Sequence, residues 1–168
     1  MNRVWKAVPA VQMESLPLTM SKEAVLKAIL AQLEIELETL TRGAKASFAA
    51  ATDPDCKAEN KYDTRTLEAS YVARGQAQRV TELQEAMRNF AALPATGGPT
   101  VKMGSLVELG MDHYFIGPAE GGLEITVDGQ EVMVITPTSP LAARLMGKTA
   151  GEKVTLPSGQ AVLLKKVD

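Results

Sequence analysis

The sequence predicts an α+β fold, in which a long antiparallel α-helical hairpin precedes a small antiparallel β domain with one short helix. Two stretches, residues 21–51 and 64–93, contain no proline and repeat apolar or small residues at alternating spacings of three and four. This spacing is typical of helices that pack along a coiled-coil seam. From residue 101 onward the apolar spacing shortens towards two, which is the period of a β-strand.

The first predicted helix begins after Ser21, whose hydroxyl suits a helix N-cap, and Glu23 suits the positive end of the helix dipole. Its seam consists of Leu30, Leu33, Leu37, Leu40, Ala44 and Ser47. The seam of the second helix consists of Thr66, Ala69, Ala73, Gln76, Val80, Leu83, Met87 and Phe90. Gly75 weakens this helix, since glycine costs about 1 kcal/mol relative to alanine in a helix interior.

Two seams of similar length, joined by a short polar segment, fold back on each other most simply as an antiparallel pair. In that register the leucines meet near the open end and the small residues meet near the turn. A helix of about 28 residues is roughly 42 Å long, so the pair forms a rod. The alternative is a helix pair within a larger oligomeric bundle.

Residues 94–100 are rich in proline and glycine, which predicts a linker between the hairpin (21–93) and the β domain (101–168). Asp128-Gly129 predicts a two-residue hairpin turn. Ser139 as cap, Pro140 at the first helical position and Gly147 at the end predict one short helix. Strands are expected at 106–109, 113–116, 123–127, 132–135, 154–156 and 160–167. Residues 1–20 show no sustained period and are expected to form an irregular arm.

Composition narrows the class of protein. The net charge of −2 argues against a stand-alone nucleic-acid binder, which needs a basic face. The single cysteine, Cys56, excludes an internal disulfide and fits a reducing compartment. No apolar run approaches the roughly 20 residues of a membrane helix, and the first residues do not resemble a secretory signal. We therefore expect a cytoplasmic protein without a membrane partner.

The segment between the two helices, residues 52–63, is the most distinctive candidate site. It holds four acids, which are Asp53, Asp55, Glu59 and Asp63. Turn and helix-end chemistry account for some of them. Carboxylates are also the oxygen ligands that Mg²⁺ accepts, and such a tip could complete a site on a partner that already holds one Mg²⁺. His113 is the only histidine, so neither a histidine metal cluster nor a catalytic triad can be assembled.

Two motifs in the β domain carry a resemblance to a known family. Gly104-Ser105-Leu106-Val107 is followed by the run Ser-Pro-Leu-Ala-Ala-Arg-Leu-Met-Gly-Lys-Thr-Ala-Gly-Glu at 139–152. Over residues 21–168 the chain resembles the bacterial Gre family of transcript-cleavage and elongation factors, which bind in the secondary channel of RNA polymerase. The resemblance implies an FKBP-like C-terminal domain that docks on the polymerase. The docking residues it suggests are Ser139, Pro140, Arg144 and Met146.

In that family an Asp and a Glu at the coiled-coil tip, in the pattern D-x-x-E-N, help to bind a second Mg²⁺ in the polymerase active centre. Glu59-Asn60 matches the end of this pattern, but Cys56 stands where the aspartate belongs and Asp55 is one residue too early. The resemblance thus implies Asp55 and Glu59 as ligands of a shared Mg²⁺, with Asp63 as a substitute. Asp53 and Asn60 would assist them, and the chain would have no cofactor of its own.

The expected function is that of an accessory factor rather than an enzyme: a monomer that binds RNA polymerase and modulates its active site, with stimulated cleavage of backtracked RNA as one form. Basic residues near the tip would approach the nascent RNA 3′ end; they are Arg42, Lys45, Lys57, Lys61 and Arg65. A non-cleaving inhibitor or modulator in the same channel is the first alternative. An FKBP-like peptidyl-prolyl isomerase and a coiled-coil adaptor without chemistry are the others.

Overall fold

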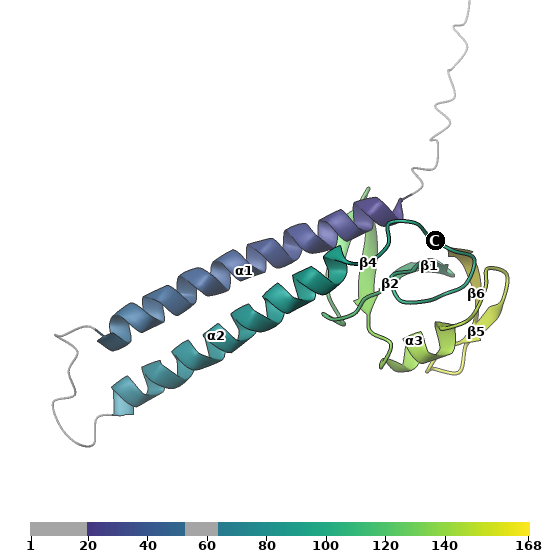
Figure 1. The fold of residues 1–168 in the computed structure, drawn as a ribbon. Helices are drawn as coiled ribbons and strands as arrows, with labels where there is room; N and C mark the ends of the chain where they lie inside the picture. Colours follow the sequence, from purple (N-terminus) through teal and green to yellow (C-terminus); the bar gives the residue numbers. More distant parts are fainter. Residues whose placement is uncertain (1–19, 53–63) are drawn as a thin grey trace, which may run out of the picture.

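The computed structural model describes residues 20–52 and 64–168, and it confirms the α+β class with a long N-terminal helix and a small sheet (Figure 1). The predicted arm, apart from Met20, and the link at 53–63 lie outside the described residues. The helices are α1 (Lys22–Thr52), α2 (Thr64–Ala91) and α3 (Pro140–Leu145). The strands are β1 (Leu106–Leu109), β2 (Asp112–Ile116), β3 (Glu124–Val127), β4 (Gln130–Ile135), β5 (Lys153–Thr155) and β6 (Ala161–Val167).

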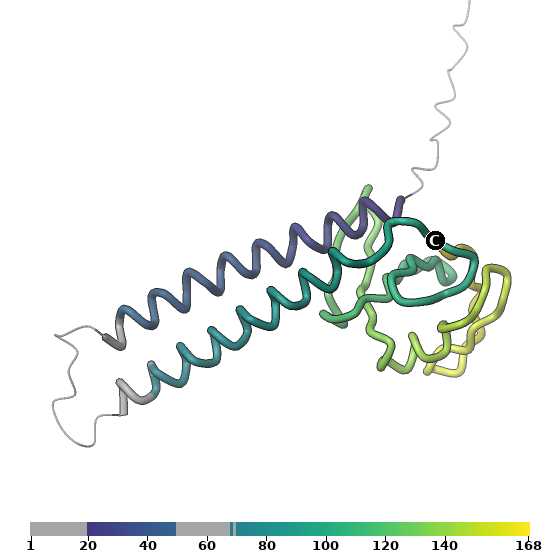
Figure 2. Tube along the Cα trace, in the orientation of Figure 1, coloured from purple at the N-terminus to yellow at the C-terminus, as the bar shows by residue number. Residues whose placement is uncertain are grey.

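Helices α1 and α2 lie side by side and antiparallel, and they project away from the sheet (Figures 1 and 2). Ser21 caps α1 as predicted, since its Oγ accepts a hydrogen bond from the Ala24 N–H at 3.1 Å. Leu33 of the predicted seam is fully buried, and Leu30, Leu37 and Leu40 are partly buried. Val25 and Ile29, which lie outside the predicted seam, are fully buried as well and continue from Leu33 at a spacing of four. This end of α1 contacts β3 as well as α2, so a second face of the helix is covered.

The strand order of the sheet is β3-β4-β2-β1-β6-β5. The prediction of a purely antiparallel sheet is wrong at one place, because β2 and β4 pair in parallel. The reason is the β3–β4 hairpin at Asp128-Gly129, which places β4 between β3 and β2. After β2 the chain crosses to the outer position, runs back as β3 and returns as β4 in the direction of β2. The other pairings among the described strands are antiparallel.

One face of the sheet packs against the base of the hairpin. Phe90 of α2 is fully buried, and its ring centroid lies 6.2 Å from that of Phe115 in β2. Gly117 makes this possible, since a Cβ there would lie 2.9 Å from the Phe90 Cζ. We call this cluster the hairpin–sheet core. Its buried members are Met20, Val25, Ile29, Leu33, Leu83, Ala86, Phe90, Leu106, Phe115, Ile125, Val127, Val132 and Val134.

The opposite face packs against α3 and forms a second cluster, the α3 core. Its buried members are Val101, Val107, Leu109, Ile116, Ile135, Ala142, Leu145, Val154 and Leu164. The sheet therefore separates two apolar layers, one made with the hairpin and one made with α3. This arrangement fixes the direction in which the hairpin leaves the β part of the molecule.

The connection between α2 and the sheet is held in place by polar contacts. Lys22 is only 2% exposed, and its Nζ donates to the carbonyl oxygen of Thr96 at 3.1 Å. Burial lowers the pKa of Lys22, and the nearby Asp168 opposes this effect. Gly97 packs so closely against Asp168 that an added Cβ would overlap it. The start of α1, the connection and Asp168 thus meet at one point.

Gly75 provides a test of the helical hairpin itself. It is exposed in α2, and no heavy atom lies within 4 Å of the position that a Cβ would take. We expect Gly75→Ala to raise the free energy of unfolding by about 1 kcal/mol, measured by urea denaturation. Gly43→Ala is the matched control, since its Cβ would meet the Gln76 Nε2 at 3.4 Å and a smaller gain is expected. Destabilisation by Gly75→Ala would contradict a regular helix at this position.

Candidate functional site

The predicted tip lies at the end of the hairpin that is remote from the sheet. Helix α1 ends there at Thr52 and α2 begins there at Thr64 (Figure 1). With 31 residues, α1 spans roughly 46 Å. The predicted site residues Asp53, Asp55, Glu59, Asn60 and Asp63 belong to the link between these helix ends and lie outside the described residues. The structure describes the two helices, α1 and α2, that flank this link.

The half of the hairpin near the tip exposes two aromatic side chains and an apolar groove. Phe48 is 65% exposed and Tyr71 is 66% exposed. A shallow groove of about 390 Å³ runs between the helices and is lined mainly by small and apolar side chains; Ala44, Phe48 and Val80 are among them. Exposed apolar surface of this kind is typical of a region that contacts a partner.

The basic residues predicted to approach RNA lie partly on this half of the hairpin. Arg42 and Lys45 are exposed on α1. Arg65 lies in the first turn of α2, and Lys57 and Lys61 lie outside the described residues. Their proximity to RNA therefore stays a prediction.

Three of the four predicted docking residues take part in holding α3 in place. Ser139 is the N-cap, and its Oγ accepts from the Ala142 N–H at 3.1 Å; Pro140 follows at the first helical position. Arg144 donates from Nη1 to the backbone carbonyl oxygens of Thr155 and Leu156, both at 2.6 Å. Met146, which follows α3, is 39% exposed. Pro140 and Met146 are accordingly the two of the four whose side chains are both apolar and exposed.

The end of the long motif also has a structural explanation. Lys148 Nζ lies 2.8 Å from a Glu152 carboxylate oxygen. The other oxygen of Glu152 accepts from the Thr149 N–H at 2.8 Å and from the Thr149 hydroxyl at 3.1 Å. Gly147 and Gly151 have φ of 80° and 94°, which favours glycine. This part of the motif therefore specifies a turn.

The short motif at residues 104–107 also has a role in the fold. Gly104 has φ of 82°, and its N–H donates to the Ile116 carbonyl oxygen at 2.8 Å. Ser105 is 1% exposed, and its Oγ accepts from the Lys102 N–H at 3.2 Å. The residues that carry the family resemblance thus determine how this part of the chain folds.

Glu152 gives the turn a measurable pH dependence. The hydrogen bonds from Lys148 and Thr149 lower the pKa of Glu152 to about 2, from 4.5. A depressed carboxyl pKa stabilises the fold above the unfolded value, and this contribution is lost as the pH falls through the folded value. We expect Glu152→Gln to lower the melting temperature at neutral pH, with the difference from wild type disappearing between about pH 4.5 and pH 2. Exposed Glu85→Gln is the control, and an equal effect of both substitutions would contradict a special role for Glu152.

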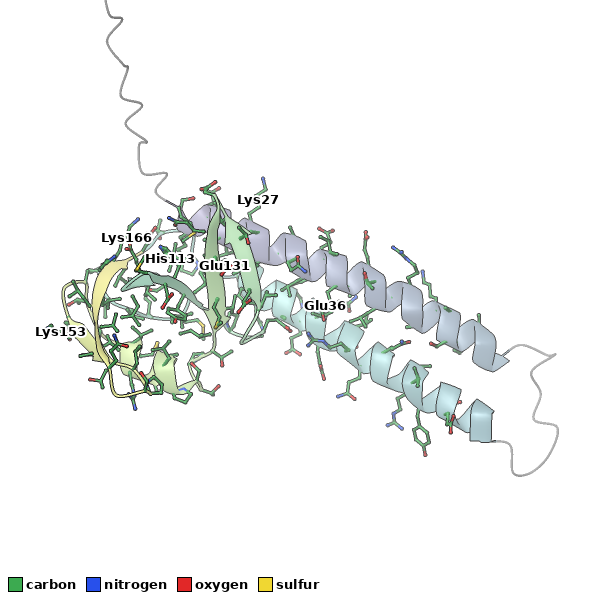
Figure 3. All side chains as sticks on the ribbon, turned by 180° about the vertical axis from the view of Figure 1, so that it is seen from behind. Lys27, Glu36, His113, Glu131, Lys153 and Lys166 are labelled. Carbon is green, nitrogen blue, oxygen red and sulfur yellow. The ribbon has the colours of Figure 1, made fainter. Side chains whose placement is uncertain are left out.

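A cluster of charges joins both helices to the sheet. Arg79 of α2 forms a two-pronged contact with Glu120, at 3.2 Å from Nη1 and 2.9 Å from Nη2. Nη2 also lies 3.0 Å from Glu36 of α1, which is labelled in Figure 3. The hydrogen bonding that Arg79 donates to Glu120 is the main cause that raises the pKa of Arg79. Since Glu120 lies in the β2–β3 loop and is 14% exposed, this cluster helps to fix the hairpin on the sheet.

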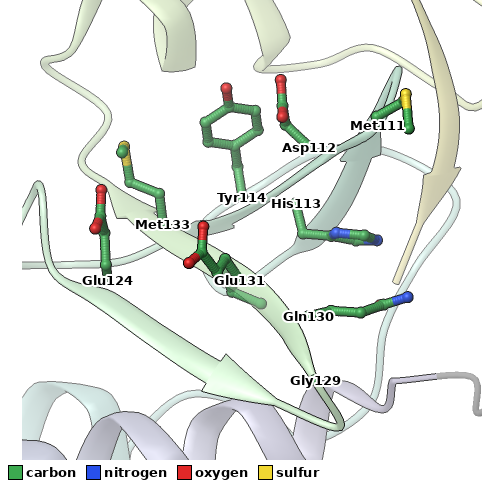
Figure 4. A pocket seen from close by; sticks show the side chains of 10 residues that line it. Met111, Asp112, His113, Tyr114, Glu124, Gly129, Gln130, Glu131 and Met133 are labelled. Carbon is green, nitrogen blue, oxygen red and sulfur yellow. The ribbon is translucent and has the colours of Figure 1, made fainter.

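The sheet has a groove of about 480 Å³ on the side away from the hairpin (Figure 4). Its lining includes Tyr114 and Met133 together with three carboxylates, Asp112, Glu124 and Glu131. An isomerase pocket of the FKBP type needs an aromatic lining. Phe115 is buried in the hairpin–sheet core instead, so the rings that line the groove among the described residues are those of His113 and Tyr114. This composition argues against the isomerase alternative.

Residues 20–52 and 64–168 contain no group of three or more His, Cys, Asp or Glu side chains placed to hold a metal ion. In the same part of the chain, no helix is long and apolar enough to span a membrane.

No family model and no curated protein matches the chain. Among solved structures it is similar to GreA factor homolog 1 (Gfh1) of Thermus thermophilus, with a TM-score of 0.32 and 18% identity, covering 83% of this chain and 94% of that one. It is similar to Gfh1 of Thermus aquaticus, with a TM-score of 0.35 and 15% identity, covering 88% and 96%. A third structure, of the transcription factor Gfh1, has a TM-score of 0.32 and 21% identity, covering 84% and 94%. At these values the likeness carries no conclusion about the activity of this chain.

Proposed function

We propose that this chain is an accessory transcription factor that binds RNA polymerase and places the tip of its hairpin in the secondary channel, where it modulates the active site. In this proposal residues 101–168 form an FKBP-like docking domain and α1 with α2 form a coiled coil. The observation that carries it is the projecting hairpin, with its acidic link at the far end (Figure 1). The Gre-like motifs at 104–107 and 139–152 support the choice of partner.

The tip would act on chemistry that belongs to the polymerase. Asp55 and Glu59 offer carboxylate oxygens, the donor type that Mg²⁺ takes, usually as one or two carboxylates per ion. They would hold an ion only together with ligands of the polymerase, with Asp63, Asp53 and Asn60 close to them in sequence. The residue Cys56, at the place of the family's aspartate, leaves two versions of the proposal: stimulated cleavage, or modulation without cleavage.

Co-purification with core RNA polymerase tests the proposal. We expect the full-length chain to be retained by immobilised core polymerase, and Met146→Glu to weaken retention because it places a charge on exposed apolar surface at the docking domain. Deleting residues 101–168 is unsuitable, since it would uncover Phe90 and the rest of the hairpin's buried base. Failure of the folded wild-type chain to bind the polymerase would refute the proposed function.

A further inference from the structure

The sheet face away from the hairpin is only partly covered. Successive side chains of a strand point to opposite faces, so Phe115 and Val132 enter the hairpin–sheet core while Tyr114 and Met133 point the other way. Tyr114 and Met133 are half-buried at the margin of the α3 core, together with Leu141 of α3. Beyond them, along β2, β4 and β3, the groove of about 480 Å³ is open (Figure 4).

The described residues that line this groove include three carboxylates and His113, and no lysine or arginine is among them. Asp112, Glu124 and Glu131 are exposed, and none of them forms an ion pair with another described residue. In Figure 4 the carboxylates of Asp112, Glu124 and Glu131 stand on the same side of the sheet as the Tyr114 ring and the Met133 thioether. Elsewhere on the sheet and hairpin, acids such as Glu108, Glu120 and Glu152 are paired with lysine or arginine.

This combination selects a cationic side chain with an apolar stem. An arginine or lysine can lay its methylenes on Met133 and Tyr114, place its charge near the tyrosine ring and reach the carboxylates. Nucleic acids and anionic membranes carry the wrong charge for such a surface. The occupant that fits is therefore a basic segment of a protein.

We propose that the groove lined by Tyr114, Met133, Asp112, Glu124 and Glu131 receives arginine or lysine side chains from a basic segment of the protein partner. This inference rests on the proposed function, in which the partner is RNA polymerase. Tyr114 and Met133 of the groove pack against the same α3 core as Leu141 in the first turn of α3, so the groove extends the predicted docking region at Ser139 and Met146 onto the sheet. The docking domain then binds through apolar contact at α3 and through charge at β2, β3 and β4.

The first test compares two neutralised variants in binding to core polymerase. Asp112→Asn, Glu124→Gln and Glu131→Gln together remove three charges from the groove and keep its shape. The matched control, Glu34→Gln, Glu38→Gln and Glu85→Gln, removes three exposed charges from the helices. We expect the groove variant to bind about tenfold more weakly and with less dependence on salt, while the control binds as wild type does. Equal binding by both variants would overturn the proposal.

The second test needs no polymerase. A capped alanine-based helical peptide with arginines along one face is added to the isotope-labelled full-length protein, and amide shifts are followed by NMR. We expect shifts in β2, β3 and β4 that disappear in the groove variant and with a matched glutamine peptide. Absence of these shifts would overturn the proposal that the groove binds basic side chains. If the shifts occur while wild type fails to bind polymerase, the groove binds basic side chains but the proposed function is refuted.

Other occupants give distinct results. Should wild type sediment as a dimer that the groove variant dissociates, a second copy of the chain occupies the groove and the proposal is overturned. Removal of residues 1–19 should leave the peptide-induced shifts unchanged. A marked strengthening of peptide binding on their removal would identify that segment as the occupant and would equally overturn the proposal.

Discussion

Phe90→Ala is expected to lower the free energy of unfolding by about 3–5 kcal/mol, the usual cost of removing a buried aromatic side chain. Phe90 is fully buried between the base of the hairpin and the sheet, beside Phe115 and Gly117. Its removal leaves a cavity at the point where the two parts of the molecule meet. Urea denaturation followed by circular dichroism measures the change.

Tyr71→Ala is the matched control for Phe90→Ala. Tyr71 is an aromatic residue on the same helix, but it is 66% exposed, so its truncation should change the free energy of unfolding by no more than about 0.5 kcal/mol. If the two substitutions cost the same, the hairpin and the sheet do not share the core described above.

The second large effect is expected at the tip. The double substitution Asp55→Ala with Glu59→Ala should reduce the factor's effect on backtracked polymerase complexes by about 10–100-fold, the usual scale for loss of metal-ordering groups. Affinity for the polymerase should stay within about twofold of wild type, because docking lies in residues 101–168 in the proposed division of labour. Cleavage and elongation assays on a defined template measure the activity, and co-purification measures the binding.

The sign of the wild-type activity decides between the two versions of the proposed function. If wild type stimulates RNA cleavage, the double variant should lose that stimulation; if wild type inhibits synthesis, the variant should lose the inhibition. Glu34→Ala with Glu38→Ala is the control, since it removes two acids from the exposed face of α1. Full activity of the tip variant would show that these carboxylates play no part.

The local elements could be predicted because their signals are local. Ser21 caps α1 by a bond that spans three residues, and Ser139 caps α3 in the same way. Asp128 and Gly129 have φ of 52° and 77°, as a two-residue hairpin turn with positive φ at both central positions requires. Helix caps and positive-φ turns favour particular residue types, so they can be predicted from the sequence.

The features that could not be predicted depend on residues far apart in the chain. The parallel pairing of β2 with β4 follows from a crossover, which strand periodicity does not record. Arg79 and Glu120 are 41 residues apart, and Lys22 and Thr96 are 74 apart. Val25 and Ile29 lie outside the predicted seam of α1 for the same reason, because the spacing of leucines does not reveal that β3 covers a second face of the helix.

The candidate site was predicted in part. The family motifs predict Ser139 and Arg144 as docking residues. In the structure the Ser139 side chain caps α3, and the Arg144 side chain donates to a carbonyl oxygen at the end of β5. The groove on the sheet was missed, since its carboxylates come from three strands and none stands out alone. The alternation of side chains along a strand gives one sequence signal for the groove. Asp112 shares a face with Tyr114, and Glu131 shares a face with Met133. A strand that is buried on both faces would have apolar residues in place of these carboxylates.

Cys56 allows the most direct measurement of where the tip goes. It is the only cysteine of the chain and lies between the two tip acids Asp55 and Glu59. With a thiol-directed photo-crosslinker on Cys56, the bound factor should crosslink to polymerase segments that line the secondary channel and the active centre, and Cys56→Ser should give no product. Crosslinks confined to the outer surface of the polymerase, from a factor that is shown to be bound, would contradict entry of the tip.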